Sequence, residues 1–286
     1  MPARDWDAPS YHAVSAPMEA LGRAVLDRLE LRGDETVLDA GCGTGRVTRA
    51  LLERLPRGRV IAVDGAPSMV EVAARELGPR ADVRLADLTE LELQTPVDAI
   101  LSTATFHWID DHPLLFARLA TALRPGGRLE AQCGGEGNVA RVHGAAEHVG
   151  GEARYAEHFD HWRGPWNFSS AQRARLDLEQ AGFEDVQAWL EPVEVHPEAP
   201  AEYLRTIVLG THLERLPEEL RSPFVSAVID RLGDPLTIDY VRLNLRARRA
   251  TPLRRRPRRD PPSGAPCARG VGSPASSGAL ARSRRV

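Results

Sequence analysis

The segment from Thr36 to Gly45 constrains the fold more tightly than any other part of this 286-residue chain. Its first half, Thr36–Ala40, is a short run of β-branched and apolar residues that predicts a buried strand. Glycines then stand at three alternate positions, and apolar residues with helical spacing begin after Gly45. A turn this tight requires positive φ angles or close approach of the backbone, both of which glycine allows. The segment therefore predicts a strand–turn–helix unit whose exposed N–H groups and helix dipole favour a polar or anionic ligand.

The spacing of the three glycines separates this turn from two common nucleotide-binding loops. The dinucleotide fingerprint G-x-G-x-x-G would place its third glycine at position 46, which is Arg46. A P-loop ends in G-K-[ST], and the chain contains no lysine. What remains is G-x-G-x-G, formed by Gly41, Gly43 and Gly45 and preceded by the acidic residue Asp39. This pattern closely resembles motif I of the class I S-adenosylmethionine (SAM)-dependent methyltransferases; taken alone, it is also compatible with a sharp turn that binds nothing.

Two later segments follow the same family pattern. The apolar segment Arg59–Asp64 predicts a second buried strand, and the carboxylate at its end can accept hydrogen bonds from two ribose hydroxyls. Asp87 follows a short third strand; it resembles the family acid that accepts a hydrogen bond from the adenine amino group, or it only caps a turn. Met69 either offers a soft surface to adenine or belongs to the core of the predicted helix Pro67–Leu77. The resemblance implies that SAM is the cofactor and that it contacts Asp39, Gly41, Gly43, Gly45, Asp64, Gly65, Met69, Asp87, Leu88 and Thr103.

The residues after the predicted fourth strand, Val97–Ser102, are where the family places groups that face the methyl acceptor. Enzymes that methylate the amino groups of bases usually carry [DNS]-P-P-[YF] here, and this chain has no such sequence. His107 could orient or deprotonate an acceptor, because the pKa of histidine lies near neutral pH; the alternative is a histidine that only satisfies backbone groups. We assign His107 as the candidate catalytic residue and Tyr11, Trp108 and Trp166 as candidate acceptor contacts.

The order of the predicted elements indicates an α/β fold. Strands alternate with helices up to residue 133, which predicts a doubly wound, mostly parallel sheet. Further segments predict a turn at 124–127 before a fifth strand at 128–132, helices at 138–148, 201–209 and 217–232, and strands at 186–190, 193–195 and 237–247. The resemblance implies a Rossmann-like, seven-stranded sheet whose last strand runs antiparallel beside the fifth, with a helical cap. We divide the chain into a lead-in at 1–33, a SAM-binding core at 34–133, a cap region with the last elements at 134–249 and a basic tail at 250–286.

Charge is distributed unevenly along the chain. The net charge is −3, yet residues 250–286 contain nine arginines and one acidic residue, so the rest of the chain is strongly acidic. An acidic globular part argues against a nucleic-acid substrate. The tail is rich in Arg, Pro, Ser and Gly, which predicts disorder. It either contacts nucleic acid or an anionic surface, or it is an extension without a specific role, and we favour the second interpretation.

Composition also limits the compartment and the cofactor. The three cysteines lack metal-ligand spacing, which predicts a reducing compartment and no metal site. The first residues lack the pattern of a signal peptide, and no apolar run approaches the ~20 residues of a membrane span. We therefore expect a cytoplasmic protein that uses SAM to methylate a carboxylate, hydroxyl or amine of a small molecule by direct displacement.

A weaker resemblance extends over residues 1–249, to the trans-aconitate methyltransferase-like group of small-molecule methyltransferases. It rests on Trp6 and Tyr11, on the segment Phe106–Trp108 and on a final strand that ends in two arginines. Three other interpretations stay open. They are a nicotinamide-dependent oxidoreductase, which Arg46 disfavours, a SAM-binding protein without activity, and a nucleic-acid methyltransferase that uses the basic tail.

Overall fold

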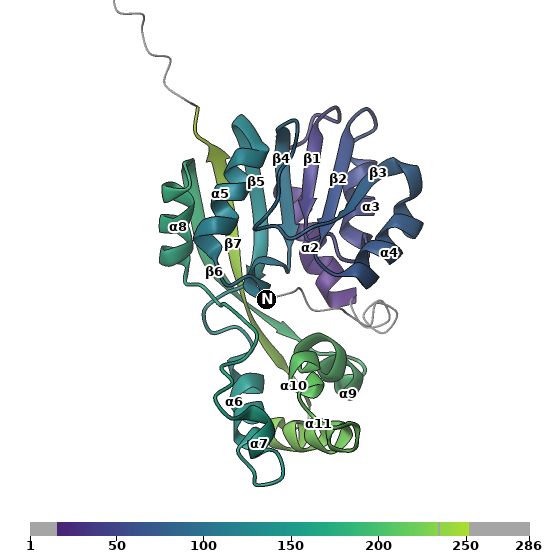
Figure 1. The fold of residues 1–286 in the computed structure, drawn as a ribbon, viewed down its shortest axis with the longest axis vertical. Helices are drawn as coiled ribbons and strands as arrows, with labels where there is room; N and C mark the ends of the chain where they lie inside the picture. The colour runs from purple at the N-terminus through teal and green to yellow at the C-terminus, as the bar shows by residue number, and fades with distance from the viewer. Residues whose placement is uncertain (1–15, 234, 252–286) are drawn as a thin grey trace, which may run out of the picture. The chain divides into compact units, whose positions relative to one another are not determined.

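Seven strands form one sheet in the computed structural model, which describes residues 16–233 and 235–251. The strands follow the order β3-β2-β1-β4-β5-β7-β6, and β7 runs antiparallel to both of its neighbours (Figure 1). Their bounds are Thr36–Ala40 (β1), Arg59–Asp64 (β2), Ala81–Leu85 (β3), Val97–Thr103 (β4), Leu123–Gly134 (β5), Phe183–Val195 (β6) and Ile238–Arg249 (β7). The predicted Rossmann-like sheet, with its last strand antiparallel beside the fifth, is confirmed. Tyr11 and the Arg-rich tail from residue 252 lie outside the described residues, so what was expected of them stays a prediction.

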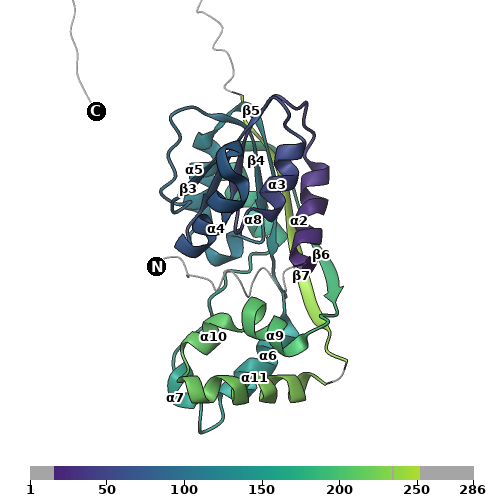
Figure 2. The same cartoon turned by 90° about the vertical axis from the view of Figure 1, so that its right-hand side faces the viewer.

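Helices cover both faces of the sheet (Figures 1 and 2). Side chains of the central strands alternate between the two faces, and both sets of side chains are apolar and must be buried. Val37 and Leu101 belong to one apolar core, whereas Leu38 and Ile100 belong to the core on the opposite face. The first core is completed by α2 (Ala16–Arg28), α3 (Arg46–Glu53) and α4 (Pro67–Leu77), and the second by α5 (His112–Ala122) and α8 (Ala171–Gln180). Burial on both faces explains why the sequences of these strands are continuously apolar.

A helical cap with its own apolar core adjoins the sheet where β6 ends and β7 begins (Figure 2). Its helices are α6 (Ala140–Gly150), α7 (Ala156–Phe159), α9 (Pro200–Tyr203), α10 (Gly210–Glu214) and α11 (Glu218–Leu232). Gly134, at the end of β5, pairs with Arg242, so residues 238–241 extend past the carboxyl ends of the parallel strands. The cap therefore lies at the end of the sheet formed by the carboxyl ends of the parallel strands, where the loops that follow these strands gather.

Three elements differ from their predictions. Residues 124–127 lie within β5 and not in a turn before it, because Leu123 already pairs with β4. A positive φ of 76° at Gly126 lets this segment bulge out of the pairing. The two predicted strands at 186–195 form one continuous strand with a register shift near its start. The helix predicted at 201–209 divides into α9, a π-helical turn and the approach to α10.

Candidate active site

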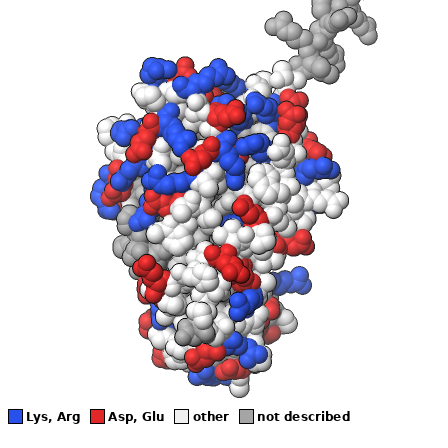
Figure 3. Space-filling view, turned by 180° about the vertical axis from the view of Figure 1, so that it is seen from behind, with Lys and Arg blue, Asp and Glu red and all other residues white. Residues whose placement is uncertain are grey.

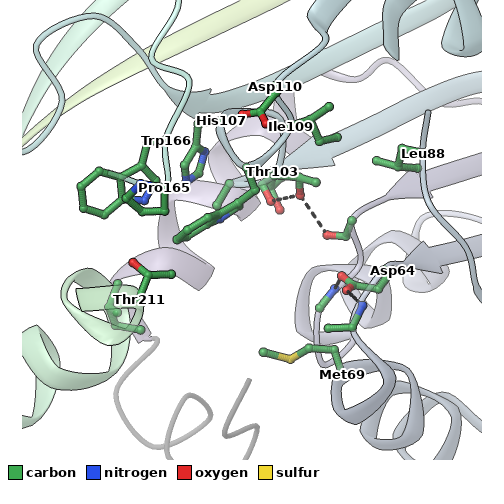
Figure 4. A pocket seen from close by; sticks show the side chains of 18 of the residues that line it. Asp64, Met69, Leu88, Thr103, His107, Ile109, Asp110, Pro165, Trp166 and Thr211 are labelled. Atoms are coloured by element: carbon green, nitrogen blue, oxygen red, sulfur yellow. Dashed lines mark hydrogen bonds between the residues drawn. The ribbon is translucent and has the colours of Figure 1, made fainter. Parts of the chain in front are cut away.

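A cavity of about 640 Å³ lies at the carboxyl ends of β1, β2 and β4, between these strands and the cap (Figure 4). β1 has β2 on one side and β4 on the other, which is the switch point at which open α/β sheets bind ligands. The predicted site residues along its wall are Gly41, Gly43, Asp64, Gly65, Met69, Asp87, Leu88, Thr103, His107, Trp108 and Trp166. The fold thus gathers residues from the loops after successive strands around one space.

The glycine turn after β1 brings the backbone itself to the cavity wall. Gly41 has a φ of 87°, and a Cβ there would lie 2.0 Å from Thr105 Oγ1. Gly43 also lines the cavity, and a Cβ there would meet no protein atom within 4 Å, so it would enter open space. The N–H groups of these two glycines are already bonded, to the carbonyl of Val63 and to a carboxylate oxygen of Asp64. The expectation that these N–H groups are exposed to a ligand is therefore wrong, and the turn provides close backbone approach instead.

Asp64 presents a carboxylate that is fixed at two points. Its Oδ2 accepts a 2.8 Å hydrogen bond from the N–H of Gly43, and its Oδ1 accepts a 2.9 Å bond from the N–H of Ala66 (Figure 4). Burial raises the pKa of Asp64, and these backbone donors partly oppose that rise. Each carboxylate oxygen can accept more than one hydrogen bond, so Asp64 can still bind a ligand hydroxyl.

Asp39 and Gly45 are absent from the cavity wall that the described residues form. Asp39 lies on the same side of β1 as Val37, so its side chain points toward α3, where Oδ2 accepts a 2.7 Å bond from Thr48 Oγ1. Burial raises the pKa of Asp39 to about 7. Gly45 is the N-cap residue of α3, with a φ of 84°. In this structure the two residues join the strand to the helix and support the turn, and their predicted contact with the cofactor stays a prediction.

The loop after β3 serves two purposes. Asp87 Oδ1 accepts hydrogen bonds from the N–H and the hydroxyl of Thr89, at 2.8 and 2.7 Å, which closes the loop. Asp87 and Leu88 also line the cavity. Met69 is buried beside Ala66 and lines the same wall. The two interpretations of Asp87 and of Met69 are therefore not exclusive, since each residue is structural and faces the cavity.

His107 stands in the 3-10 turn Phe106–Trp108 that follows β4. Its ring is buried, and Nδ1 accepts a 3.2 Å hydrogen bond from the backbone N–H of Gly134. Burial, together with the nearby charge of Arg242, holds the pKa of His107 well below its usual value, so the ring is neutral. A neutral imidazole that accepts at Nδ1 carries its proton on Nε2. Proton abstraction by His107 therefore does not fit this geometry, whereas hydrogen-bond donation does.

Aromatic side chains form the cap-side end of the cavity. The ring centroids of Trp108 and Trp166 lie 6.2 Å apart, and Trp166 stacks on Phe168 at 5.4 Å. The N–H of Asn167 donates a 2.9 Å bond to the carbonyl of His107, which ties this segment to the turn after β4. Trp166 and His107 lie across the cavity from Asp64 and Met69 (Figure 4). The cavity therefore has a polar end at Asp64 and an aromatic end at the cap.

Arg242 was not among the site residues predicted from the sequence. This β7 residue lines the cavity with a side chain only 2% exposed. Its Nε donates a 3.3 Å bond to Gln132 Oε1, and its guanidinium lies 5.6 Å from the ring centroid of Tyr240. The available signal was the alternation of polar residues along this strand, because Arg242, Asn244 and Arg246 share one face between apolar neighbours.

Two expected features can be checked only for residues 16–233 and 235–251. Within these ranges, no three His, Cys, Asp or Glu side chains are grouped as for a metal ion. Nor do the same ranges include a helix with the length and apolar character needed to cross a membrane. Cys42 and Cys133 are buried thiols that form no disulfide, and Cys267 lies outside the described residues.

The sequence and the fold of this chain are similar to those of known methyltransferases. Residues 37–127 match the family described as methyltransferase domain. The chain is 30% identical over 219 residues to an uncharacterised methyltransferase of Schizosaccharomyces pombe, and the alignment covers 68% of this chain and 83% of that protein. It is 29% identical over 255 residues to a trans-aconitate 2-methyltransferase of Variovorax paradoxus, with 84% of this chain and 94% of that protein covered.

A similar fold occurs in a solved structure of phosphoethanolamine N-methyltransferase 2 from Haemonchus contortus, bound to phosphomonomethylethanolamine and S-adenosylhomocysteine. The TM-score is 0.57 at 18% sequence identity, and the match covers 85% of this chain and 57% of that one. At this identity, the likeness concerns the fold.

Proposed function

The chain belongs to the class I SAM-dependent methyltransferases, and we propose that it moves the methyl group of SAM to a carboxylate of a small-molecule acceptor. One observation carries the proposal: a single cavity is lined by Asp64 and the glycine turn at one end and by His107 and Arg242 at the other. A fixed carboxylate suits a nucleoside, and a buried guanidinium suits an anion. The two ends therefore suit a cofactor and an acidic acceptor in one space.

The residues at the Asp64 end fit SAM. Asp64 can accept hydrogen bonds from the ribose hydroxyls while the backbone holds it in place. The space at Gly43 that a side chain would fill lets the ligand approach the main chain. Met69 and Leu88 offer apolar contact to the adenine ring. When bound, SAM supplies a methyl group on a positively charged sulfur, which is a good leaving group.

A carboxylate acceptor is supported by the state of His107. Hydroxyl and ammonium acceptors must lose a proton before or during methyl transfer, and the Nδ1 of His107 is already occupied by Gly134. A carboxylate is ionised at neutral pH and needs no general base. The similarity to a trans-aconitate 2-methyltransferase supports the same class of acceptor.

The protein's contribution to the reaction would be alignment and shielding. The Nε2–H of His107 would hold one carboxylate oxygen, leaving the other to attack the methyl group in line. Trp108 and Trp166 would exclude water from the reacting groups. Neither a covalent intermediate on the protein nor a proton transfer is needed for this displacement.

The test is a panel of carboxylic acids that includes trans-aconitate, citrate and succinate, each compared with its amide and with an alcohol of similar size. S-adenosylhomocysteine formation is measured with SAM present. We expect turnover with at least one acid and none with its amide. Turnover only with alcohols or amines would contradict the proposed acceptor. Binding of SAM without turnover of any compound would favour a SAM-binding protein without activity.

Two further expectations belong to the same proposal. A nucleic-acid substrate is disfavoured, and the mixture of arginine and carboxylate side chains on the face seen in Figure 3 agrees with this. A cytoplasmic location is supported by the small number of cysteines and by two buried thiols that form no disulfide.

A further inference from the structure

We propose that Gln132 and Asn244 are positioning residues that aim Arg242 at the acceptor carboxylate, with the Nε2–H of His107 as the second donor. This inference rests on the proposed function, because it assumes an acidic acceptor. It assigns a recognition subsite to side chains from β5 and β7 that lie more than a hundred residues apart in the chain.

The three side chains form a chain of hydrogen bonds between two paired strands. Gln132 pairs with Asn244 in the sheet, and Gly134 pairs with Arg242. Arg242 Nε donates to Gln132 Oε1 at 3.3 Å, and Gln132 Nε2 donates to Asn244 Oδ1 at 2.9 Å. Side chains two positions apart share one face of a strand, so the bonds follow from the register.

The direction of every bond in this chain is determined. An arginine side chain only donates, so Gln132 must turn its oxygen toward Arg242 and its NH₂ group toward Asn244. Asn244 Oδ1 also accepts a 2.8 Å bond from Arg28, and its Nδ2 donates a 3.0 Å bond to Glu191. Rotating either amide by half a turn would break bonds at both of its ends. Arg242 is therefore held through Nε.

Stability alone does not account for polar groups at these positions. Gln132 is 4% exposed and Asn244 is fully buried, on a face of β5 and β7 that also carries the buried Glu130. Replacing buried charged and polar groups by apolar residues of similar volume is often neutral or stabilising. Besides the bonds of Asn244 to Arg28 and Glu191, the bond from Arg242 to Gln132 positions a charged group at the cavity, which an apolar residue at 132 could not do.

Gly134 contacts both donors of the proposed subsite, His107 and Arg242. Its N–H fixes the ring of His107, and its partner across the strands is Arg242. A Cβ on Gly134 would lie 2.6 Å from the Phe168 ring and 2.8 Å from Asn138 Nδ2, so a side chain there would force both neighbours to shift. His107 and Arg242, which Gly134 contacts through its N–H and its strand pairing, both line the cavity.

The test uses full-length protein and the panel acid that the wild-type protein methylates fastest. Gln132→Met removes both amide bonds at nearly constant volume. We expect KM for the acid to rise about tenfold or more, with kcat changed less than about threefold and affinity for S-adenosylhomocysteine unchanged.

Gln132→Glu is the second variant, in case the first does not fold. Its carboxylate would compete with the acid for Arg242 and raise KM as well. Gln187→Met, on the exposed edge strand β6, is the control and should match the wild type.

A double-mutant cycle separates positioning from structural support. Arg242→Lys keeps the charge and loses the Nε bond, so its effect and that of Gln132→Met should be strongly non-additive. Additive effects, or a lower melting temperature with unchanged KM, would overturn the proposal. Wild-type turnover of acids with unchanged KM in both Gln132 variants would overturn this inference alone. Wild-type turnover of only alcohols or amines would overturn the proposed function and this inference together.

Discussion

The backbone N–H of Gly134 donates a hydrogen bond to Nδ1 of His107 across 3.2 Å. This bond fixes the tautomer of a buried imidazole and turns Nε2 into a donor. A residue whose type suggests a base is thereby restricted to hydrogen-bond donation. A carboxylate acceptor, as proposed above, is ionised at neutral pH and would need no base from this ring.

The first prediction concerns substitution of His107. A glutamine at this position would retain a donor near the place of Nε2, whereas a shorter asparagine could accept from Gly134 near the place of Nδ1 but would have no donor that reaches the place of Nε2. We therefore expect His107→Gln to keep more activity than His107→Asn, which should lose about tenfold or more in kcat/KM. The measurement is S-adenosylhomocysteine formation with the panel acid. Equal, near-complete loss in both variants would argue against donation.

The second prediction concerns pH. The pKa of His107 lies well below its usual value, so the ring stays neutral above that usual value and through the alkaline range. The rate of methyl transfer in a single turnover should therefore be flat from about pH 7 to about pH 9. A rate that rises tenfold per pH unit in this range would reveal a general base that the account lacks.

The third prediction concerns the cofactor end. Asp64→Asn removes the charge that strengthens hydrogen bonds from the ribose, so affinity for SAM should fall by about ten- to a hundredfold. Calorimetric titration measures this, and Asp82→Asn, on an exposed carboxylate of β3, is the control. Because burial raises the pKa of Asp64, wild-type affinity should also fall on acidification at a higher pH than an ordinary aspartate would cause. Unchanged affinity in Asp64→Asn would remove this residue from the cofactor site.

The fourth prediction concerns Asp39 and stability without cofactor. Its folded-state pKa of about 7 lies above the value of about 3.9 in an unfolded chain. The folded state therefore holds a proton that the unfolded state has lost, and stability falls as pH rises toward 7. Between about pH 5 and about pH 8, the wild type should lose about 2–3 kcal/mol of unfolding free energy relative to Asp39→Asn. Urea unfolding at both values measures it; a constant difference between the proteins would contradict the raised pKa.

The fifth prediction concerns Gly134→Ala. The added Cβ would press on Phe168 and Asn138, which should destabilise the protein by about 1–3 kcal/mol. Displacement of the His107 ring should weaken acceptor turnover while SAM still binds. Thermal unfolding and SAM titration separate the two effects, and loss of SAM binding in a folded variant would show that the two ends of the cavity are not independent.

Local patterns were sufficient for the first half of the fold. The bounds of β1, β2 and α4 agree with the sequence predictions, because buried parallel strands are apolar runs and the helix carries proline in its first turn. The glycine spacing also placed the turn at the cavity. The same patterns could not reveal that neighbouring carbonyl and carboxylate groups occupy the N–H groups of Gly41 and Gly43, since those partners belong to β2.

The acceptor end depends on contacts between distant parts of the chain. Arg242 reaches the cavity only because β7 pairs antiparallel with β5, and no local motif indicates that register. Asp39 is a different case, because the period of two along β1 already places its side chain on the same face as that of Val37. The alternation of side chains between the two faces of a predicted strand therefore indicates where such a residue points, in addition to what the motif indicates.

Identification of the bond formed in one turnover distinguishes transfer to a carboxylate from transfer to any other acceptor group. The wild-type protein is mixed with stoichiometric SAM and the panel acid, and the product is analysed by mass spectrometry before and after mild alkali. We expect one S-adenosylhomocysteine per product, a product heavier by one methylene group, and return of the original acid in alkali, as for a methyl ester. A methylated product that survives alkali would contradict transfer to a carboxylate.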